Sequence, residues 1–311
     1  MSKRKNRFSF AQISRLTATE ADAIGFAEHL RWPEGITCHR CESGDVARLG
    51  GRPGRYRCRA CDRQFSIRTG TPMESSRLPI STWLRGLWLI LTSSKGISSL
   101  KLAEMLGIQQ RSAWFLAHRV REMMAWVVRK PLSDEIVEVD EVYAGAKPRK
   151  KAGGGPTGVK SGRGPRRPLV FTAAVRGGEA RFTRIASHGT GDFANAIDKL
   201  VDTAGTFMTD SLPGYDFLKE NHRSVTHSEK EFARTDPDGT VVHVNTAESC
   251  HADLRRMVIG VHHWISRQHL DRYLEDLAFR RSLRDADVLE RLRASLTSPG
   301  RLTYRDLIAQ P

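Results

Sequence analysis

The spacing of apolar residues changes period along the chain. Residues 135–143, Glu-Ile-Val-Glu-Val-Asp-Glu-Val-Tyr, combine β-branched apolar side chains with acids, which is typical of a strand in a half- or fully buried sheet. Strands are also predicted over residues 169–175 and 181–187, joined as a hairpin by the turn Arg-Gly-Gly-Glu. A helix over residues 191–203 and a strand over residues 206–210 follow.

This order of three strands, a helix and a fourth strand is that of an RNase H-like fold. We therefore predict an α/β domain with a mixed sheet over residues 134–285. In such a sheet the first and fourth strands lie side by side, although the chain between them is long.

Residues 79–130 have the helical period instead. A helix is predicted to begin at Pro79, and a second helix, a turn at Gly107 and a third helix follow. Leu-x-x-x-Leu-Gly-Ile before a polar, basic helix start is typical of a helix-turn-helix. Its last helix would offer Gln110 and Arg111 to a DNA major groove. The alternative is an αα-hairpin that only packs.

The two ends of the chain carry weaker patterns. Residues 1–34 are predicted as a basic tail followed by a short amphipathic helix, with Thr17 or Thr19 as its N-cap. Residues 286–311 have a helical pattern and are predicted as a C-terminal tail.

Four cysteines are spaced as two close pairs. Cys38 and Cys41 form one Cys-x-x-Cys pair, and after sixteen residues Cys58 and Cys61 form the other. This spacing falls in the range of a tetrahedral four-thiolate zinc site. Residues 35–70 are therefore predicted as a zinc ribbon whose zinc is structural, because four thiolates leave no open coordination position.

The charge of the chain narrows its possible partners. With 50 Lys and Arg against 35 Asp and Glu, its formal charge is +15 over 311 residues. Such a field favours double-stranded DNA as the partner, with an anionic membrane surface as a weaker alternative. No signal-peptide pattern follows the basic N-terminus, and the most apolar window, residues 83–91, is too short to span a bilayer. We expect a soluble, cytoplasmic protein that does not contact membranes.

Residues 144–168 are rich in Gly, Lys and Arg, and no core can form from them. We predict a basic loop that contacts DNA phosphates through Lys147, Arg149, Lys150 and Lys151. A purely solvated loop is the alternative.

Three acids stand in matching contexts. Asp140 and Asp210 lie at the ends of the predicted first and fourth strands, and Glu248 begins a predicted helix. Converging carboxylates can hold a pair of hard divalent ions for phosphodiester chemistry. Arg255, two helical turns after Glu248, is placed to grip a phosphate.

Each acid also has a simpler explanation. A strand acid can face water at a sheet edge, and Asn-Thr-Ala-Glu248 is also a capping box in which the glutamate caps its own helix. Glu138 shares the face of Asp140 by alternation, whereas Glu141 is predicted on the opposite face.

Together these motifs resemble the DDE transposases of bacterial insertion sequences, in the group called insertion-sequence family fifteen-ninety-five. The matching pieces are the four cysteines, Val-Glu-Val-Asp140-Glu-Val-Tyr, Met-Thr-Asp210-Ser, Val-Asn-Thr-Ala-Glu248-Ser with Arg255, and His269-Leu-Asp-Arg-Tyr273-Leu-Glu-Asp-Leu-Ala-Phe-Arg280.

The resemblance implies a catalytic triad of Asp140, Asp210 and Glu248 that holds two Mg²⁺ ions, or Mn²⁺. It implies cleavage at the ends of a mobile element and transfer of the freed 3′-hydroxyl into target DNA. Family members act as multimers on paired DNA ends, so we expect a homo-oligomer on the bacterial nucleoid. A hydrolytic nuclease of the same fold, and an inactive zinc-ribbon DNA-binding regulator, are the alternatives.

Overall fold

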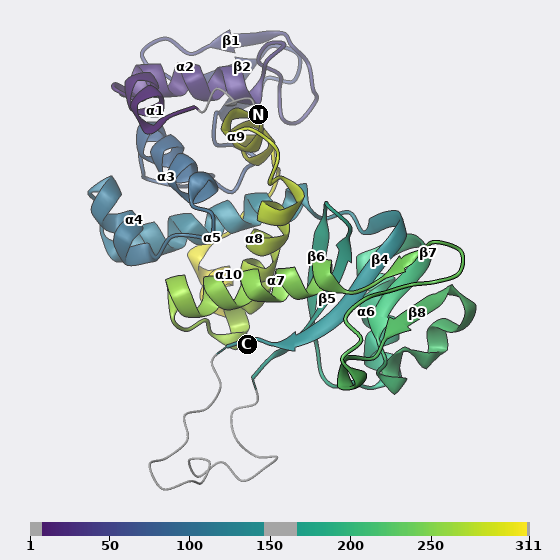
Figure 1. Ribbon diagram of the computed structural model, residues 1–311. Helices are drawn as coiled ribbons and strands as arrows, with labels where there is room; N and C mark the ends of the chain where they lie inside the picture. The colour runs from purple at the N-terminus through teal and green to yellow at the C-terminus, as the bar shows by residue number, and fades with distance from the viewer. Residues whose placement is uncertain (1–7, 146–166, 310–311) are drawn as a thin grey trace, which may run out of the picture. The chain divides into compact units, whose positions relative to one another are not determined.

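The computed structural model describes residues 8–145 and 167–309 (Figure 1). The chain divides into two compact units. The first unit joins Met1–Val127 to Leu283–Pro311, and the second unit is Val128–Ser282.

A five-stranded sheet organises the second unit (Figure 1). Its strands are β4 (Leu132–Tyr143), β5 (Leu169–Val175), β6 (Ala180–Ile185), β7 (Val201–Asp210) and β8 (His222–Val225), in the order β6-β5-β4-β7-β8. β5 pairs antiparallel with both β4 and β6, whereas β4, β7 and β8 run parallel. The predicted RNase H-like mixed sheet is confirmed, with the first and fourth strands adjacent.

Alternation along β4 separates two packing layers. Val137 and Val139 join the cluster that includes Phe171 and Phe193, on the side covered by helix α6 (Thr190–Leu200). Ile136 packs instead with a second cluster around Met208. On that second side helix α7 (Asn245–Arg255) contacts β4 and β5. Because successive side chains of a strand point to opposite faces, acids on β4 can enter either of the two packing layers.

Short elements complete the second unit. They are η1 (Pro213–Asn221), η2 (His227–Glu229), the two-stranded hairpin of β9 (Arg234–Thr235) and β10 (Val241–Val242), the π-helical turn η3 (Arg256–His262), η4 (Arg267–His269) and α8 (Leu270–Ser282). α8 packs on β6, where Arg184 forms a two-point ion pair with Asp271.

The first unit begins with two capped helices, α1 (Phe10–Leu16) and α2 (Glu20–Arg31). Thr19 is the N-cap of α2, as predicted. α1 was not expected. Its Ser9 and Gln12 form a reciprocal capping box, and Phe10 lies against Trp88, so a helix of 7 residues is stabilised by one cap and one aromatic contact.

A three-stranded antiparallel sheet follows, with β1 (Val46–Arg48), β2 (Arg55–Cys58) and β3 (Gln64–Ser66) in that order. Its small core consists of Tyr56, Phe65 and the buried thiols Cys38 and Cys58, with Trp32 edge-on to Tyr56. Glu28 of α2 accepts hydrogen bonds from Tyr56 and Arg48, which ties the ribbon to the preceding helix.

The remaining helices of the first unit are α3 (Ile80–Thr92), α4 (Ser99–Leu106), α5 (Gln110–Val127), α9 (Val288–Leu296) and α10 (Tyr304–Ala309). Gly107 ends α4 in the left-handed conformation, at φ 64°, where glycine has no Cβ penalty. The predicted helix, glycine turn and helix are thus present. The C-terminal residues, expected as a tail, form α9, which packs on α2, α3 and α5.

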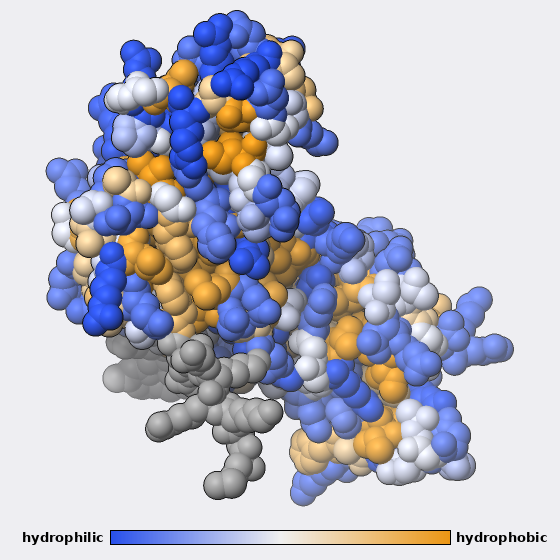
Figure 2. All heavy atoms as spheres, turned by 90° about the horizontal axis from the view of Figure 1, so that it is seen from above, coloured by the Kyte–Doolittle hydropathy of each residue, from blue (hydrophilic) through white to orange (hydrophobic). Residues whose placement is uncertain are grey.

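Hydrophilic residues cover much of the face seen in Figure 2. In the described part of the chain, no helix is both long enough and apolar enough to cross a membrane.

Candidate active site

The four ribbon cysteines come together as a cluster. Cys38 Sγ lies 3.7 Å from Cys61 Sγ, and Cys41 Sγ lies 3.6 Å from Cys58 Sγ. A tetrahedral zinc with Zn–S bonds of about 2.3 Å separates its sulfurs by about 3.8 Å. The pairing of each thiol with one from the other Cys-x-x-Cys motif therefore fits a zinc site, and Cys250 is buried elsewhere, as a core residue.

A second cluster lies at the carboxyl ends of β4 and β7. The parallel register pairs Glu138 with Met208, which places Asp140 opposite Asp210 two residues further on. Each of Asp140, Glu141 and Asp210 offers one carboxylate oxygen within 4.8 Å of the others. The predicted neighbourhood of Asp140 and Asp210 is present in the structure, and Glu141 joins it.

Glu141 reaches this cluster from the other face of the strand. Its Oε2 accepts a hydrogen bond of 2.9 Å from the Tyr215 hydroxyl, which belongs to the α6 layer, and its Oε1 lies 3.7 Å from His188 Nε2. Alternation correctly predicts the opposite face, but the neighbouring strand β7 ends at Asp210, so side chains from both faces of β4 can reach the same point.

The clustered acids repel one another. Burial, and next the charge of Glu141, raise the pKa of Asp140 to about 8, with further contributions from Asp210 and Glu248. Burial likewise raises the pKa of Glu141 to about 7, although the Tyr215 hydroxyl counteracts it. The pKa of Asp210 is also raised, by burial. A site that disfavours its own negative charges is one that a cation would stabilise.

The surroundings of Asp210 also favour a bound cation. Among the described residues, its buried Oδ1 has no hydrogen-bond donor. Buried carboxylate oxygens are ordinarily satisfied, and hard divalent ions bind oxygen ligands of this kind. The donor set therefore fits Mg²⁺ or Mn²⁺.

Glu138 has a different task from its neighbour Asp140. It is fully buried, and its carboxylate accepts hydrogen bonds from the backbone N–H groups of Thr246 (2.6 Å) and Ala247 (3.2 Å). Arg176 Nε donates to it at 2.9 Å, and His243 Nδ1 lies 3.1 Å away. Glu138 thus caps the N-terminus of α7, where the helix dipole favours a negative charge.

This cap excludes one of the two explanations of Glu248. No side chain of α7's own N-terminus caps the helix, so the predicted capping box does not form. Glu248 is instead 47% exposed, with Oε1 3.8 Å from His227 Nδ1. Its charge helps raise the pKa of Asp140, yet its oxygens lie outside the cluster of Asp140, Glu141 and Asp210.

Two histidines lie beside the acids. His251 was not predicted from the sequence, and the sequence left the role of His227 open. His251 Nδ1 lies 3.5 Å from Asp140 Oδ2, and its Nε2 lies 3.1 Å from Thr172 Oγ1. Burial, followed by Arg255, lowers the pKa of His251 to about 4, so the ring is neutral at physiological pH. His227 approaches both Glu248 and Asp210 from the turn after β8. A position three residues after Glu248 on a helix was the one available signal for His251.

The predicted DNA-binding residues are dispersed. Arg255 is exposed in the last turn of α7, near enough to affect His251. At the start of α5, Gln110 donates to Ser99 at 2.8 Å and Arg111 lies 4.6 Å from the Tyr304 ring centroid. Lys147, Arg149, Lys150 and Lys151 lie outside the described residues.

Comparison with known proteins identifies the family. Residues 131–282 match the ISXO2-like transposase domain, and residues 18–64 match the transposase zinc-ribbon domain. The chain belongs to the ISXO2-like transposases. The resemblance to the DDE transposases of insertion-sequence family fifteen-ninety-five is thereby confirmed, and the transposase match spans nearly the whole second unit.

A curated relative agrees with this assignment. The chain is 29% identical over 280 residues to the "Uncharacterized protein in transposable element ISH50" of Halobacterium salinarum, covering 85% of this chain and 92% of the relative. A solved chain, from the "Crystal structure of a pre-cleavage Mos1 transpososome", is similar at 14% identity over 70% of this chain and 78% of that chain. Its TM-score of 0.24 is too low to carry an argument.

Proposed function

We propose that this transposase cleaves DNA at the ends of its insertion sequence and transfers the freed 3′-hydroxyl into target DNA. The observation that carries the proposal is the convergence of the Asp140 and Asp210 carboxylates from two neighbouring parallel strands, inside the matched transposase domain. Three carboxylates with raised pKa values around one point suit divalent-ion binding better than a purely structural role.

In this proposal Asp140 and Asp210 hold the shared cation position, and Glu248 contributes from α7. Two Mg²⁺ ions, or Mn²⁺, when bound there, would activate the attacking hydroxyl and neutralise the leaving oxygen. Glu138 fixes the start of α7 and so fixes where Glu248 points. His251 holds Asp140 from behind without adding charge.

The remaining roles concern DNA. Arg255 is proposed to contact a phosphate beside the acids, and Gln110 and Arg111 to approach DNA from the helix-turn-helix-like region. Lys147, Arg149, Lys150 and Lys151 are proposed to contact the backbone. Action in the bacterial cytoplasm, on nucleoid DNA, by a homo-oligomer is part of the same proposal.

The test compares wild type with Asp140→Asn and with a matched control on the same strand, Glu135→Gln, which is exposed. Labelled DNA carrying the element ends is incubated with target plasmid and Mg²⁺. We expect strand-joined products from wild type and Glu135→Gln, and a loss of about 10³-fold or more in Asp140→Asn. Cleavage without joining would identify a hydrolytic nuclease. DNA binding without either, unchanged in Asp140→Asn, would identify a regulator.

A further inference from the structure

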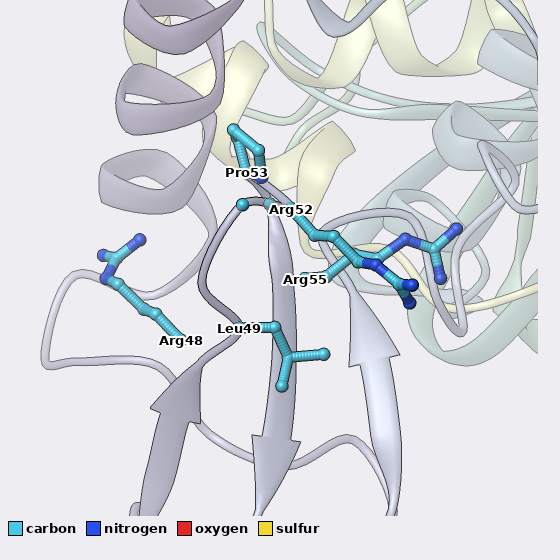
Figure 3. Close-up of a pocket in the computed structure, with 7 residues that line it drawn as sticks. Arg48, Leu49, Arg52, Pro53 and Arg55 are labelled. Carbon is cyan, nitrogen blue, oxygen red and sulfur yellow. The ribbon is translucent and has the colours of Figure 1, made fainter.

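A pocket of about 350 Å³ lies in the zinc ribbon, in the turn that joins β1 to β2. Residues between Arg48 and Arg55 line it (Figure 3). Gly51 and Gly54 adopt φ of 68° and 72°, a left-handed conformation that side chains with a Cβ rarely adopt. The glycines let the chain fold back tightly, so that Arg48, Arg52 and Arg55 all line the pocket.

The three arginines of this turn differ in the direction of their side chains and in whether they form an ion pair. Arg48 binds Glu28 at 2.7 and 2.5 Å and points away from the other two. Arg52 and Arg55 extend together to the opposite side (Figure 3). Both are exposed, and neither has an acidic partner within the described residues.

Other arginines of the ribbon differ in whether they are paired: Arg40 and Arg63 are also exposed with no ion pair among the described residues. On β2 and just after it, Arg57 pairs with Asp62 at 2.6 Å and Arg59 with Asp45 at 3.3 Å. Residues 35–70 contain eight arginines, three acids and no lysine. The guanidinium fork matches phosphate oxygens bidentately, whereas an ammonium acts as a point charge. What distinguishes Arg52 and Arg55 is that they line one pocket and extend to the same side, so two unpaired guanidinium groups are available together to a phosphate.

We propose that Arg52 and Arg55 form a binding site for the phosphate backbone of DNA. The inference rests on the proposed function, because it assumes a DNA substrate, and it assigns the ribbon to DNA instead of to a protein partner. The contact is independent of base sequence, since phosphates carry no base information.

The experiment measures how DNA affinity depends on salt. Zinc-loaded full-length protein without Mg²⁺ is titrated into labelled duplex DNA at several salt concentrations. Arg52→Ala/Arg55→Ala is expected to lower the slope of log affinity against log salt by about 1–2 units, and affinity at physiological salt roughly tenfold or more. Arg52→Lys/Arg55→Lys is expected to keep the slope and recover only part of the affinity.

The matched control is Arg57→Ala/Arg59→Ala, on the same ribbon but already paired with acids, with an expected slope change under half as large. Zinc content verifies that each variant keeps its fold. An unchanged slope in Arg52→Ala/Arg55→Ala, with wild type still binding DNA, overturns this site alone. Failure of wild type to bind DNA at all refutes the proposed function instead.

A separate observation concerns the turn between β8 and β9. Phe232 is 61% exposed there, and its ring lies 5.6 Å from the ring of His227, centroid to centroid. His227 is in turn 3.8 Å from Glu248. The exposed aromatic ring is therefore separated from the acids by one side chain.

This turn is held in place. Glu231 Oε2 accepts a hydrogen bond of 3.0 Å from Thr226 N, and Lys230 adopts φ 63°. Arg234 donates to Asp236 at 2.7 Å. An apolar ring kept in solvent on a braced turn, beside sites for phosphodiester chemistry, has the properties of a stacking platform.

We infer that Phe232, backed by His227, stacks on an unpaired base of the DNA strand being cut. This also rests on the proposed function, because a scissile phosphate at the acids brings the neighbouring bases within reach of the ring. Base–aromatic stacking tolerates any sequence, since every base has a π-face.

The experiment places 2-aminopurine at successive positions along the element end and follows its fluorescence on binding. Wild type is expected to quench it at positions next to the cut. Phe232→Ala is expected to lose that quenching and about tenfold to a hundredfold in cleavage rate. Phe232→Trp is expected to restore both, and Val241→Ala, exposed on β10 of the hairpin that follows this turn, to change neither. If wild type cleaves with no quenching at any position, the platform is refuted while the proposed function stands.

Discussion

The thiol cluster and the acid cluster both gather groups that can bind a cation, but they are built in opposite ways. The thiols come from two short turns within one small ribbon, whose core is otherwise Tyr56 and Phe65. The acids come from strands separated by a hairpin and a helix, on a sheet with two apolar layers. The ribbon has little to stabilise it besides its metal, whereas the sheet would hold its acids in place even while they repel one another.

Removing zinc should therefore have the largest effect. Structural zinc contributes roughly 10–16 kcal/mol in small zinc domains, so Cys58→Ser is expected to unfold the ribbon. Hydrogen exchange should become fast over residues 38–66 while the protection of β4 and β7 is kept. His39→Ala, beside a ligand but outside the cluster, is the control. Loss of protection in both regions would contradict the expectation that the ribbon unfolds while the five-stranded sheet stays folded.

Removing the α7 cap should be next in size. In Glu138→Gln a neutral amide replaces the carboxylate that accepts hydrogen bonds from two backbone N–H groups, and Arg176 is left with a neutral partner. We expect a loss of about 2–4 kcal/mol in the free energy of unfolding, measured by urea denaturation. Glu179→Gln, from a pair with Arg181 whose glutamate is 53% exposed, should cost less than about 1 kcal/mol. Equal losses would show that Glu138 is an ordinary ion pair.

Neutralising the acid cluster should act in the opposite direction. Without added Mg²⁺, Asp140→Asn is expected to stabilise the second unit by about 1–3 kcal/mol at neutral pH. Folding raises the pKa of Asp140 through burial and the charge of Glu141, so folding must protonate an acid that is ionised in the unfolded chain, and the neutral amide avoids that cost. The same variant should lose the stabilisation that Mg²⁺ gives to wild type. Thermal unfolding with and without Mg²⁺ measures both. A destabilised Asp140→Asn that still responds to Mg²⁺ would place the ion elsewhere.

The pH dependence should be the smallest effect. A carboxyl pKa raised in the folded state means that the folded protein binds more protons than the unfolded chain. Without Mg²⁺ the free energy of unfolding should thus fall as pH rises from near 4, the ordinary value, to about 8, the value for Asp140. Added Mg²⁺ should flatten this fall, since it binds the deprotonated acids. Denaturation midpoints across that range test the sign.

The two clusters were also unequally predictable. The thiol site could be predicted from spacing because each Cys-x-x-Cys turn is local. Asp140 and Asp210 could be predicted as neighbours because the order of elements implies the strand order. The role of Glu138 could not, since it depends on a backbone N–H 108 residues away. Glu141 was left open because alternation assigns a face but does not say that two faces converge at a strand end.

The spacing between Glu138 and Asp140 along β4 fixes how far the start of α7 lies from the acid cluster. Glu138 fixes the position of the α7 start along β4, and Asp140 lies one strand repeat of about 6.6–6.8 Å further on the same face, at the proposed cation position. Inserting or deleting one residue between them would turn the Asp140 side chain to the opposite face of β4, toward the α6 layer. Glu248 would then no longer have the Asp140 carboxylate beside it. Anyone transplanting this site to another sheet must therefore carry the tripeptide and the helix start together, because neither has a defined geometry without the other.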